Sequence, residues 1–170
     1  YAAQQSGANP YVLASMILVE QGRDGSGNSI SGKVSGYEGY YNFFNIRAYA
    51  SGGYDAVTYG LMYASEGTSY NRPWNTRVKS IVGGAIYYAT SYINNNQDTL
   101  YLKKFNVMNG LSSVATHQYM TNVAGASQEA ANLRQGYDLD SAITFYIPVY
   151  SGMPTAACPA PGSGNNNYFL

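Results

Sequence analysis

Glu20 is the residue whose type and surroundings most clearly predict chemistry. It lies near the end of a strongly apolar helical segment, residues 9–22. A carboxyl group beside a wall of apolar side chains is partly desolvated, which raises its pKa toward the range of a general acid. That wall is expected to contain Val12, Met16, Ile17 and Val19. The alternative is a surface glutamate that ends an ordinary buried helix, because charged side chains are usually exposed.

A second chemically informative segment follows Glu20 along the chain. Residues 23–39 are rich in Gly and Ser and predict a long loop or small lobe, and residues 40–46 are then rich in aromatic and amide side chains. A helix that ends in Glu, a loop, and an Asn-aromatic-aromatic-Asn segment occur in the same order in lysozyme-like glycosidases. The sequence therefore predicts an acid, an overhanging lobe and a sugar groove.

Four segments in this order resemble glycoside hydrolase family 73, whose members are bacterial endo-β-N-acetylglucosaminidases. They are residues 9–22, 42–46, 74–92 and 117–122, and the resemblance as a whole covers roughly residues 2–147. The resemblance implies an α+β, mainly α, lysozyme-like fold with a helical body and a small loop/β lobe flanking a substrate groove. It also implies hydrolysis of the β-1,4 bond between N-acetylglucosamine and N-acetylmuramic acid in peptidoglycan, with Glu20 as the general acid.

Glycoside hydrolysis normally uses a second carboxylate, and four acids lie near Glu20 in sequence. Glu38 is the leading candidate because it lies in the aromatic segment, although a solvated loop acid is the alternative. Asp55 and Glu66 flank a predicted helix, as capping and terminal charges do, and Asp24 completes the group.

A second carboxylate is not required if the 2-acetamido group of the substrate attacks the anomeric carbon. In that scheme a tyrosine hydroxyl or an asparagine amide orients the acetamide and stabilises its developing charge. The family resemblance assigns such a role to Tyr119, one of 19 tyrosines in the chain.

Sugar rings stack on aromatic side chains, and their hydroxyl groups hydrogen-bond to amides and phenols. Because neighbouring residues of an extended segment face opposite ways, only one of Phe43 and Phe44 is expected in the groove. Trp74 has a second interpretation, which is to anchor the helix that follows it. The predicted substrate-binding residues are Gln21, Tyr40, Tyr41, Asn42, Phe44, Asn45, Trp74 and Gln118.

The composition excludes several other functions. The chain has nine Lys and Arg against nine Asp and Glu, so it lacks the basic field that nucleic-acid binding requires. No apolar run is long enough to span a membrane. His117 has no second His and no Cys beside it, so it is read as structural, and neither a metal site nor a cofactor is expected.

The predicted organisation is one catalytic domain, residues 1–150, followed by a tail or linker, residues 151–170. Cys158 lies in the Pro-rich tail and, as the only cysteine, cannot form an internal disulfide. The first residues read as the end of a helix already under way, so we expect an excised domain without its leader. We expect it to be a monomer, secreted and associated with a Gram-positive cell wall, tethered to cell-wall-binding modules.

Periodicity and capping residues predict four helices after the acid helix. A short strand or extended wall is expected over residues 40–48, and an extended closing segment over residues 141–150. The Gly83–Gly84 pair predicts that another backbone packs closely on its helix. The four helices are expected at about residues 52–65, 76–94, 98–107 and 125–135.

Three other functions remain open. A muramidase or a lytic transglycosylase of the same fold would cleave the adjacent linkage or leave a 1,6-anhydro end. A non-catalytic cell-wall glycan-binding module would bind walls without releasing soluble fragments. A structural cell-surface domain would bury Glu20 against a partner.

Overall fold

Side-chain caps at the helix starts explain why the helices begin where they do. The side chains of Asn9, Asp55, Thr76 and Thr99 each accept a hydrogen bond from a backbone N–H in the first turn of the helix that follows. Such a bond satisfies one of the backbone donors that a helix start leaves unpaired. The computed structural model describes residues 1–120, 122–138, 140 and 142–156. Its α-helices are α1 (Ala2–Ser6), α2 (Pro10–Gln21), α3 (Ala56–Ser65), α4 (Arg77–Ser91), α5 (Leu100–Phe105) and α6 (Gly125–Arg134).

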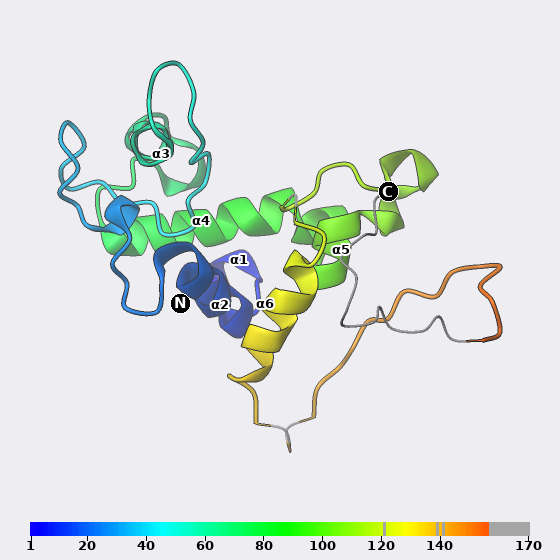
Figure 1. The fold of residues 1–170 in the computed structure, drawn as a ribbon. Helices are drawn as coiled ribbons and strands as arrows, with labels where there is room; N and C mark the ends of the chain where they lie inside the picture. The colour runs from blue at the N-terminus through cyan, green and yellow to red at the C-terminus, as the bar shows by residue number, and fades with distance from the viewer. Residues whose placement is uncertain (121, 139, 141, 157–170) are drawn as a thin grey trace, which may run out of the picture.

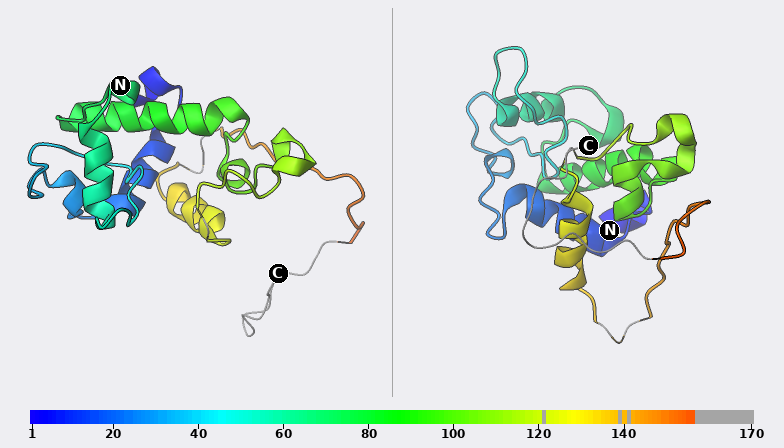
Figure 2. Two further views of the ribbon diagram at one scale, coloured as in Figure 1. Left: turned by 90° about the horizontal axis from the view of Figure 1, so that it is seen from above. Right: turned by 45° about the vertical axis from the view of Figure 1, so that its right-hand side comes forward.

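Helix α4 runs through the middle of the molecule, and the other helices are arranged around it (Figure 1). In both views of Figure 2, α3 and the long loops lie toward one end of α4, whereas α5 and α6 lie toward the other. Helix α1 packs against α4, and α6 packs against both α2 and α5. The mainly helical fold that was predicted is therefore confirmed. None of the described helices has the length and apolar character needed to cross a membrane.

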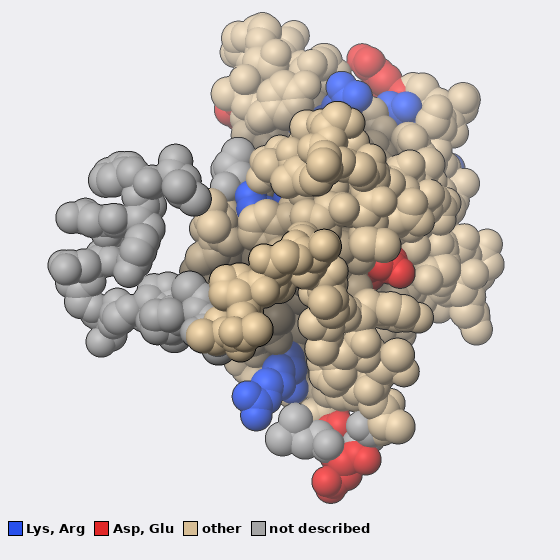
Figure 3. Space-filling model, turned by 90° about the vertical axis from the view of Figure 1, so that its right-hand side faces the viewer, with Lys and Arg blue, Asp and Glu red and all other residues tan. Residues whose placement is uncertain are grey.

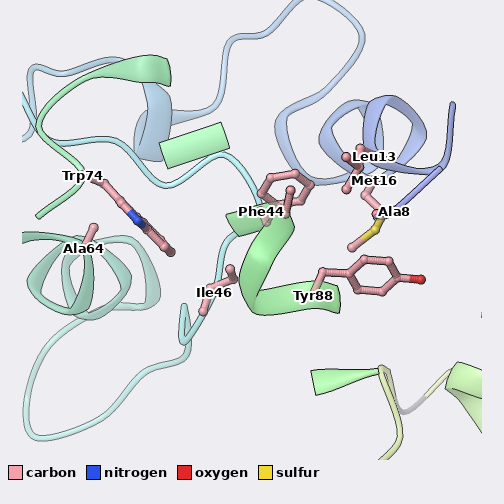
Figure 4. Packing of buried hydrophobic residues seen from close by; sticks show 9 residues of the cluster. Ala8, Leu13, Met16, Phe44, Ile46, Ala64, Trp74 and Tyr88 are labelled. Atoms are coloured by element: carbon pink, nitrogen blue, oxygen red, sulfur yellow. The ribbon is translucent and has the colours of Figure 1, made fainter. Parts of the chain in front are cut away.

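The core packs against α4 at the Gly83–Gly84 pair. A Cβ atom on Gly83 would collide with the backbone oxygen of Tyr70 and the indole of Trp74, and one on Gly84 would collide with the Phe44 ring. Figure 4 shows Phe44 lying over α4, next to side chains from α2. The close approach that the two glycines predicted is confirmed, because only residues without a side chain leave room for these neighbours.

The lobe between α2 and α3 consists of turns, loops and one short 3₁₀ helix, η1 (Asn28–Ile30). Apart from one isolated bridge between Ser51 and Tyr54, the described residues contain no β-structure. The strand expected over residues 40–48 is therefore wrong. The Asn42 side chain accepts a hydrogen bond from the Ile46 backbone N–H and donates one to the Ile46 carbonyl, which closes a local turn where a strand would have to stay extended.

The segment after α6 carries no regular structure over residues 142–150 (Figure 1), and at its end the Tyr150 hydroxyl lies 2.7 Å from the Tyr101 hydroxyl of α5. Phe145, Ile147 and Val149 are exposed there, so their alternation does not mark a buried strand face. The predicted tail lies outside the described residues from residue 157 onward, as does Cys158.

Candidate active site

Glu20 is held at the end of α2 by a side chain from the lobe. The Asn45 amide nitrogen donates to the Glu20 carboxylate oxygen Oε2 at 2.9 Å and to the Glu20 backbone oxygen at 3.1 Å. Burial raises the pKa of the Glu20 carboxyl above its ordinary value, and the Asn45 hydrogen bond opposes this rise. The carboxyl group is therefore half-buried, fixed in orientation and biased toward its protonated form.

The amide that holds Glu20 is itself fully engaged. Asn45 Oδ1 accepts from Ser29 Oγ at 2.7 Å and from Gln21 Nε2 at 3.2 Å. Gln21 is only 3% exposed, and its amide also donates to the backbone oxygens of Asn42 and Phe43. The prediction that Gln21 binds sugar is corrected, because its amide is buried and hydrogen-bonded to the protein. Asn45 lines the cavity, and sugar binding by it stays a prediction.

Glu20 opens into a cavity of about 230 Å³ between α2, the lobe and α4. Aromatic rings dominate its walls, and Glu20 is the one acid among the described residues that line it. Aromatic walls around a single ionisable group suit a sugar ring that must be bound beside an acid. The lining residues are Met16, Glu20, Phe44, Asn45, Ile46, Arg47, Gly84, Tyr87, Tyr88, Tyr92, Tyr119 and Met120.

Tyr119 lines the same cavity as Glu20. Its ring packs edge-on against Tyr92 and Tyr88, with centroids 5.5 and 6.3 Å away. Burial, and then the charge of Glu20, raise the pKa of the Tyr119 phenol well above its ordinary value. The phenol therefore stays protonated, and so can donate a hydrogen bond, at neutral pH.

Two other predicted sugar ligands belong to the core. Asn42 is 0% exposed, and its amide nitrogen donates to the backbone oxygens of Ile46 and Gly60. Trp74 is also 0% exposed, and its indole N–H donates to the Tyr70 backbone oxygen at 2.7 Å. The prediction that Asn42 and Trp74 bind sugar is therefore wrong, and Trp74 instead anchors the start of α4. Phe44 is buried too, but one side of it forms part of the cavity floor.

Four further candidates do not line the Glu20 cavity. Glu38 is exposed on the lobe and Tyr40 is half-buried there. The Tyr41 ring lies 5.4 Å from the Arg77 guanidinium. Gln118 is exposed, and its amide oxygen accepts from Lys104 Nζ at 2.5 Å. The structure therefore does not bring these residues together with Glu20 and Tyr119.

The remaining charged and imidazole candidates lie outside the Glu20 cavity. Asp55 caps α3 by accepting from Thr58, and Glu66 is exposed at the other end of that helix. His117 hydrogen-bonds to Gln97 at 2.9 Å, and its ring stacks on Tyr92. Among the described residues, no cluster of three His, Cys, Asp or Glu side chains is arranged to bind a metal.

Sequence reasoning missed most of the cavity wall. Tyr87 and Tyr88 stand three and four residues after Gly84, so the three share one helix face, and this spacing could have revealed them. Arg47 directly follows the 42–46 motif and lines the cavity from the lobe. The prediction that Val19 belongs to the apolar wall beside Glu20 is wrong, because Val19 is 48% exposed.

Val19 lies instead in a second, larger groove of about 490 Å³ between α2 and α6. Tyr11, Leu18 and Leu133 also line this groove, whereas Glu20 does not. Helix α2 therefore presents different faces to the cavity and to the groove, and Glu20 lines only the smaller of the two, the cavity.

The chain is similar to bacterial wall-lytic proteins over most of its length. It is 34% identical over 158 residues, or 88% of the chain, to a bifunctional autolysin of Staphylococcus epidermidis. It is also 34% identical over 149 residues to a β-N-acetylglucosaminidase of Bacillus subtilis. Its fold matches a catalytic mutant of Staphylococcus aureus Autolysin E in complex with the disaccharide NAG-NAM, with a TM-score of 0.60 and 29% identity over 80% of this chain and 55% of that one.

The chain belongs to glycoside hydrolase family 73. No protein-family model matches the sequence, so the assignment rests on these individual relatives. A second structure of Autolysin E, in complex with the muropeptide NAM-L-Ala-D-iGlu, gives the same TM-score at 33% identity. The lysozyme-like architecture expected from the sequence is confirmed. The chain spans 11% of the length of the Staphylococcus epidermidis relative and 15% of the Bacillus subtilis one.

Proposed function

We propose that this chain is the catalytic domain of an endo-β-N-acetylglucosaminidase that hydrolyses peptidoglycan. The observation that carries the proposal is the half-buried Glu20 carboxyl, oriented by Asn45 at the wall of an aromatic cavity. The cleaved bond is the β-1,4 bond between N-acetylglucosamine and N-acetylmuramic acid. The relatives named above, one of them solved with the disaccharide NAG-NAM, support this choice of substrate.

In the first step the Glu20 carboxyl gives its proton to the glycosidic oxygen as the bond from that oxygen to the anomeric carbon breaks. The acetamide oxygen of the same N-acetylglucosamine attacks the anomeric carbon and forms a cyclic oxazolinium ion. The Glu20 carboxylate then takes a proton from a water molecule that attacks this carbon and reopens the ring. The acid is thereby restored and the anomeric configuration is retained.

The acetamide route is favoured because Glu20 is the one acid among the described residues that line the cavity. Tyr119 is the group that orients the acetamide, since its protonated phenol lines the same cavity. Donors fixed where charge develops stabilise a transition state more than donors that must first reorganise. Glu38, exposed on the lobe, has no catalytic part in this scheme.

The test is product analysis of purified cell walls digested by wild type, Glu20→Gln and a matched control, Glu66→Gln, which changes an exposed acid at the end of α3. We expect wild type and the control to release fragments with N-acetylglucosamine at the reducing end. Glu20→Gln should lower turnover by roughly 10²- to 10⁴-fold, because it removes the proton and keeps the shape.

The same digest separates the competing functions. N-acetylmuramic acid at the reducing end would make the protein a muramidase, and a 1,6-anhydro end a lytic transglycosylase. Wall binding without soluble fragments would make it a glycan-binding module. Near-normal turnover by Glu20→Gln would contradict the mechanism.

We further propose that the domain acts as a monomer, secreted and cell wall associated, and joined to wall-binding modules in the full-length protein. The chain carries few charges, nine Lys and Arg against nine Asp and Glu, which suits binding through uncharged sugar hydroxyl and acetamide groups. On the face in Figure 3, the described residues are mostly uncharged, and acidic and basic side chains are scattered. Light scattering at increasing protein concentration tests this, because a monomer should keep the molar mass of one chain.

A further inference from the structure

A buried ion pair joins α5 to α6 behind the wall of the Glu20 cavity. Lys103 Nζ lies 2.7 Å from Glu129 Oε2, and the two side chains are 1% and 7% exposed. Within the described part of the chain, neither of these two charged atoms has a hydrogen-bond partner beyond the ion pair itself. A buried pair of this kind contributes little to stability, because the free energy needed to remove two charges from water is about as large as their electrostatic attraction. Its place in the molecule therefore calls for another explanation.

Lys103 contacts Tyr119 in two ways. Its ammonium nitrogen lies 3.9 Å from the centroid of the Tyr119 ring, and its backbone oxygen accepts from the Tyr119 backbone N–H at 3.0 Å. The same ammonium group lies 5.6 Å from the centroid of Tyr88, the ring that packs edge-on against Tyr119. A desolvated cation over a phenol ring is strongly attracted to it. Lys103 thus holds from behind the two rings that face the cavity.

The two charges of the pair act on Glu20 in opposite directions. The Lys103 ammonium lowers the pKa of the Glu20 carboxyl and the Glu129 carboxylate raises it. The other titratable or charged groups around the cavity are Arg47 from the lobe, Tyr87 and Tyr88 from α4, Tyr92 after α4, and Tyr119. With both partners present the pair adds no net charge behind the acid.

We propose that Lys103 and Glu129 are positioning residues for the reaction: Lys103 fixes the Tyr119 ring at the cavity wall, and Glu129 balances the Lys103 charge so that Glu20 keeps the proton it donates. This inference rests on the proposed glucosaminidase function. It predicts a signature that a purely structural pair would not give. Removing the Glu129 charge alone and removing the Lys103 charge alone should shift the pKa of Glu20 in opposite directions.

The experiment follows the alkaline limb of the pH–rate profile, which reports loss of the Glu20 proton. Glu129→Gln leaves the cation unbalanced, lowers the pKa of Glu20 and moves the limb to lower pH. Lys103→Met leaves the anion unbalanced and moves the limb to higher pH. Each shift should be about half a pH unit or more, as expected for one charge inside a protein. Lys103→Arg keeps the charge and should leave the limb in place.

The double variant Lys103→Met with Glu129→Gln separates charge from position. It leaves no unbalanced charge, so its alkaline limb should coincide with that of wild type. Because Tyr119 has lost its cation, kcat should fall roughly fivefold or more, with KM little changed. This variant also covers the case in which a single substitution does not fold, since replacing both partners avoids a lone buried charge.

Two surface substitutions serve as matched controls. Lys79→Met on α4 and Glu66→Gln after α3 make the same changes in net charge at exposed positions. Neither should move the limb. Circular dichroism of each variant checks that the comparison is made on folded protein.

A second readout is independent of turnover. Titration of the Glu20 carboxyl carbon by NMR, in the protein without substrate, should show the same opposite shifts in the two single variants. Shifts in the same direction, no shifts in folded variants, or a double variant with the kcat of wild type would each overturn the inference. If wild type released no wall fragments, the proposed function would fail, while the NMR titration would still decide the role of the ion pair.

Discussion

At the scale of single residues, the site depends on how the protein fixes one carboxyl group. Asn45 donates to Glu20 from the lobe, and Asn45 is itself held by Ser29 and Gln21. Sequence reasoning identified Glu20 and Tyr119, which the structure places in one cavity. It assigned Gln21 and Asn42 to the sugar, because a polar side chain in a motif gives no sign of whether its partners are ligand or backbone. That distinction is set by tertiary burial.

Asn45→Ala tests the support of the acid. The hydrogen bond from Asn45 lowers the pKa of Glu20, so its loss should raise this pKa and move the alkaline limb of the pH–rate profile to higher pH. At the optimum pH, kcat should fall roughly 10- to 100-fold, because the freed carboxyl group no longer points at the substrate. An unchanged limb and an unchanged kcat would contradict the role given to Asn45. Asn132→Ala, at an exposed position on α6, is the matched control.

Glu20→Gln should also change stability in a pH-dependent way. An acid whose pKa is raised by folding holds its proton more tightly in the native state, so its stabilising contribution is greatest at low pH and is lost as pH rises through the unfolded and folded pKa values. Replacing it by neutral Gln should therefore raise Tm at pH 7 relative to wild type, and the difference should vanish near pH 4. Calorimetry at both pH values measures this. A lower Tm at pH 7 would show that the charged carboxylate is favoured by its surroundings.

At the scale of secondary structure, the helices could be predicted more accurately than the lobe. Caps such as Asn9 and Thr76, and the glycine after α2, act within a few residues, so they can be read from sequence. The lobe was expected to contain a strand, but its backbone follows side-chain hydrogen bonds from Asn42 and positive φ angles at Asn45 and Arg47. These features depend on partners in other elements, which local patterns do not specify.

Gly84→Ala tests the contact between α4 and the lobe. In an exposed helix this change is stabilising, but here the added Cβ would collide with the Phe44 ring. We expect the free energy of unfolding to fall by about 1–3 kcal/mol, as for overpacking elsewhere, and turnover to fall because Phe44 forms part of the cavity floor. Urea denaturation measures the first effect. Thr90→Ala, at an exposed position on the same helix, should leave both quantities unchanged, and a stabilised Gly84→Ala would rule out the close contact.

At the scale of the whole molecule, the candidate active site lies where four parts of the chain converge. Helix α2 provides the acid, α4 and the lobe provide walls, and the segment before α6 provides Tyr119. The order of these segments along the chain was readable, and it carried the family resemblance. The place where these segments meet could not be read from the sequence, because only the spacing of Gly84, Tyr87 and Tyr88 marks the aromatic wall of α4.

The predicted domain boundary at residue 150 has a direct test. Residues 151–156 are exposed, and the Tyr150 hydroxyl, which stays in the shortened chain, hydrogen-bonds to the Tyr101 hydroxyl of α5. A chain ending at residue 150 should unfold at the same temperature as the full chain and digest walls at the same rate. A drop of several degrees in Tm, or a loss of turnover, would place part of the tail inside the catalytic domain.

The saturated amide of Asn45 has a consequence for the timing of the reaction. Because each of its donors and acceptors is already satisfied by the protein, an arriving glycan strand finds the proton donor preset and has nothing to rearrange around it. The reorganisation that a freely rotating acid would need when substrate binds is thus completed during folding.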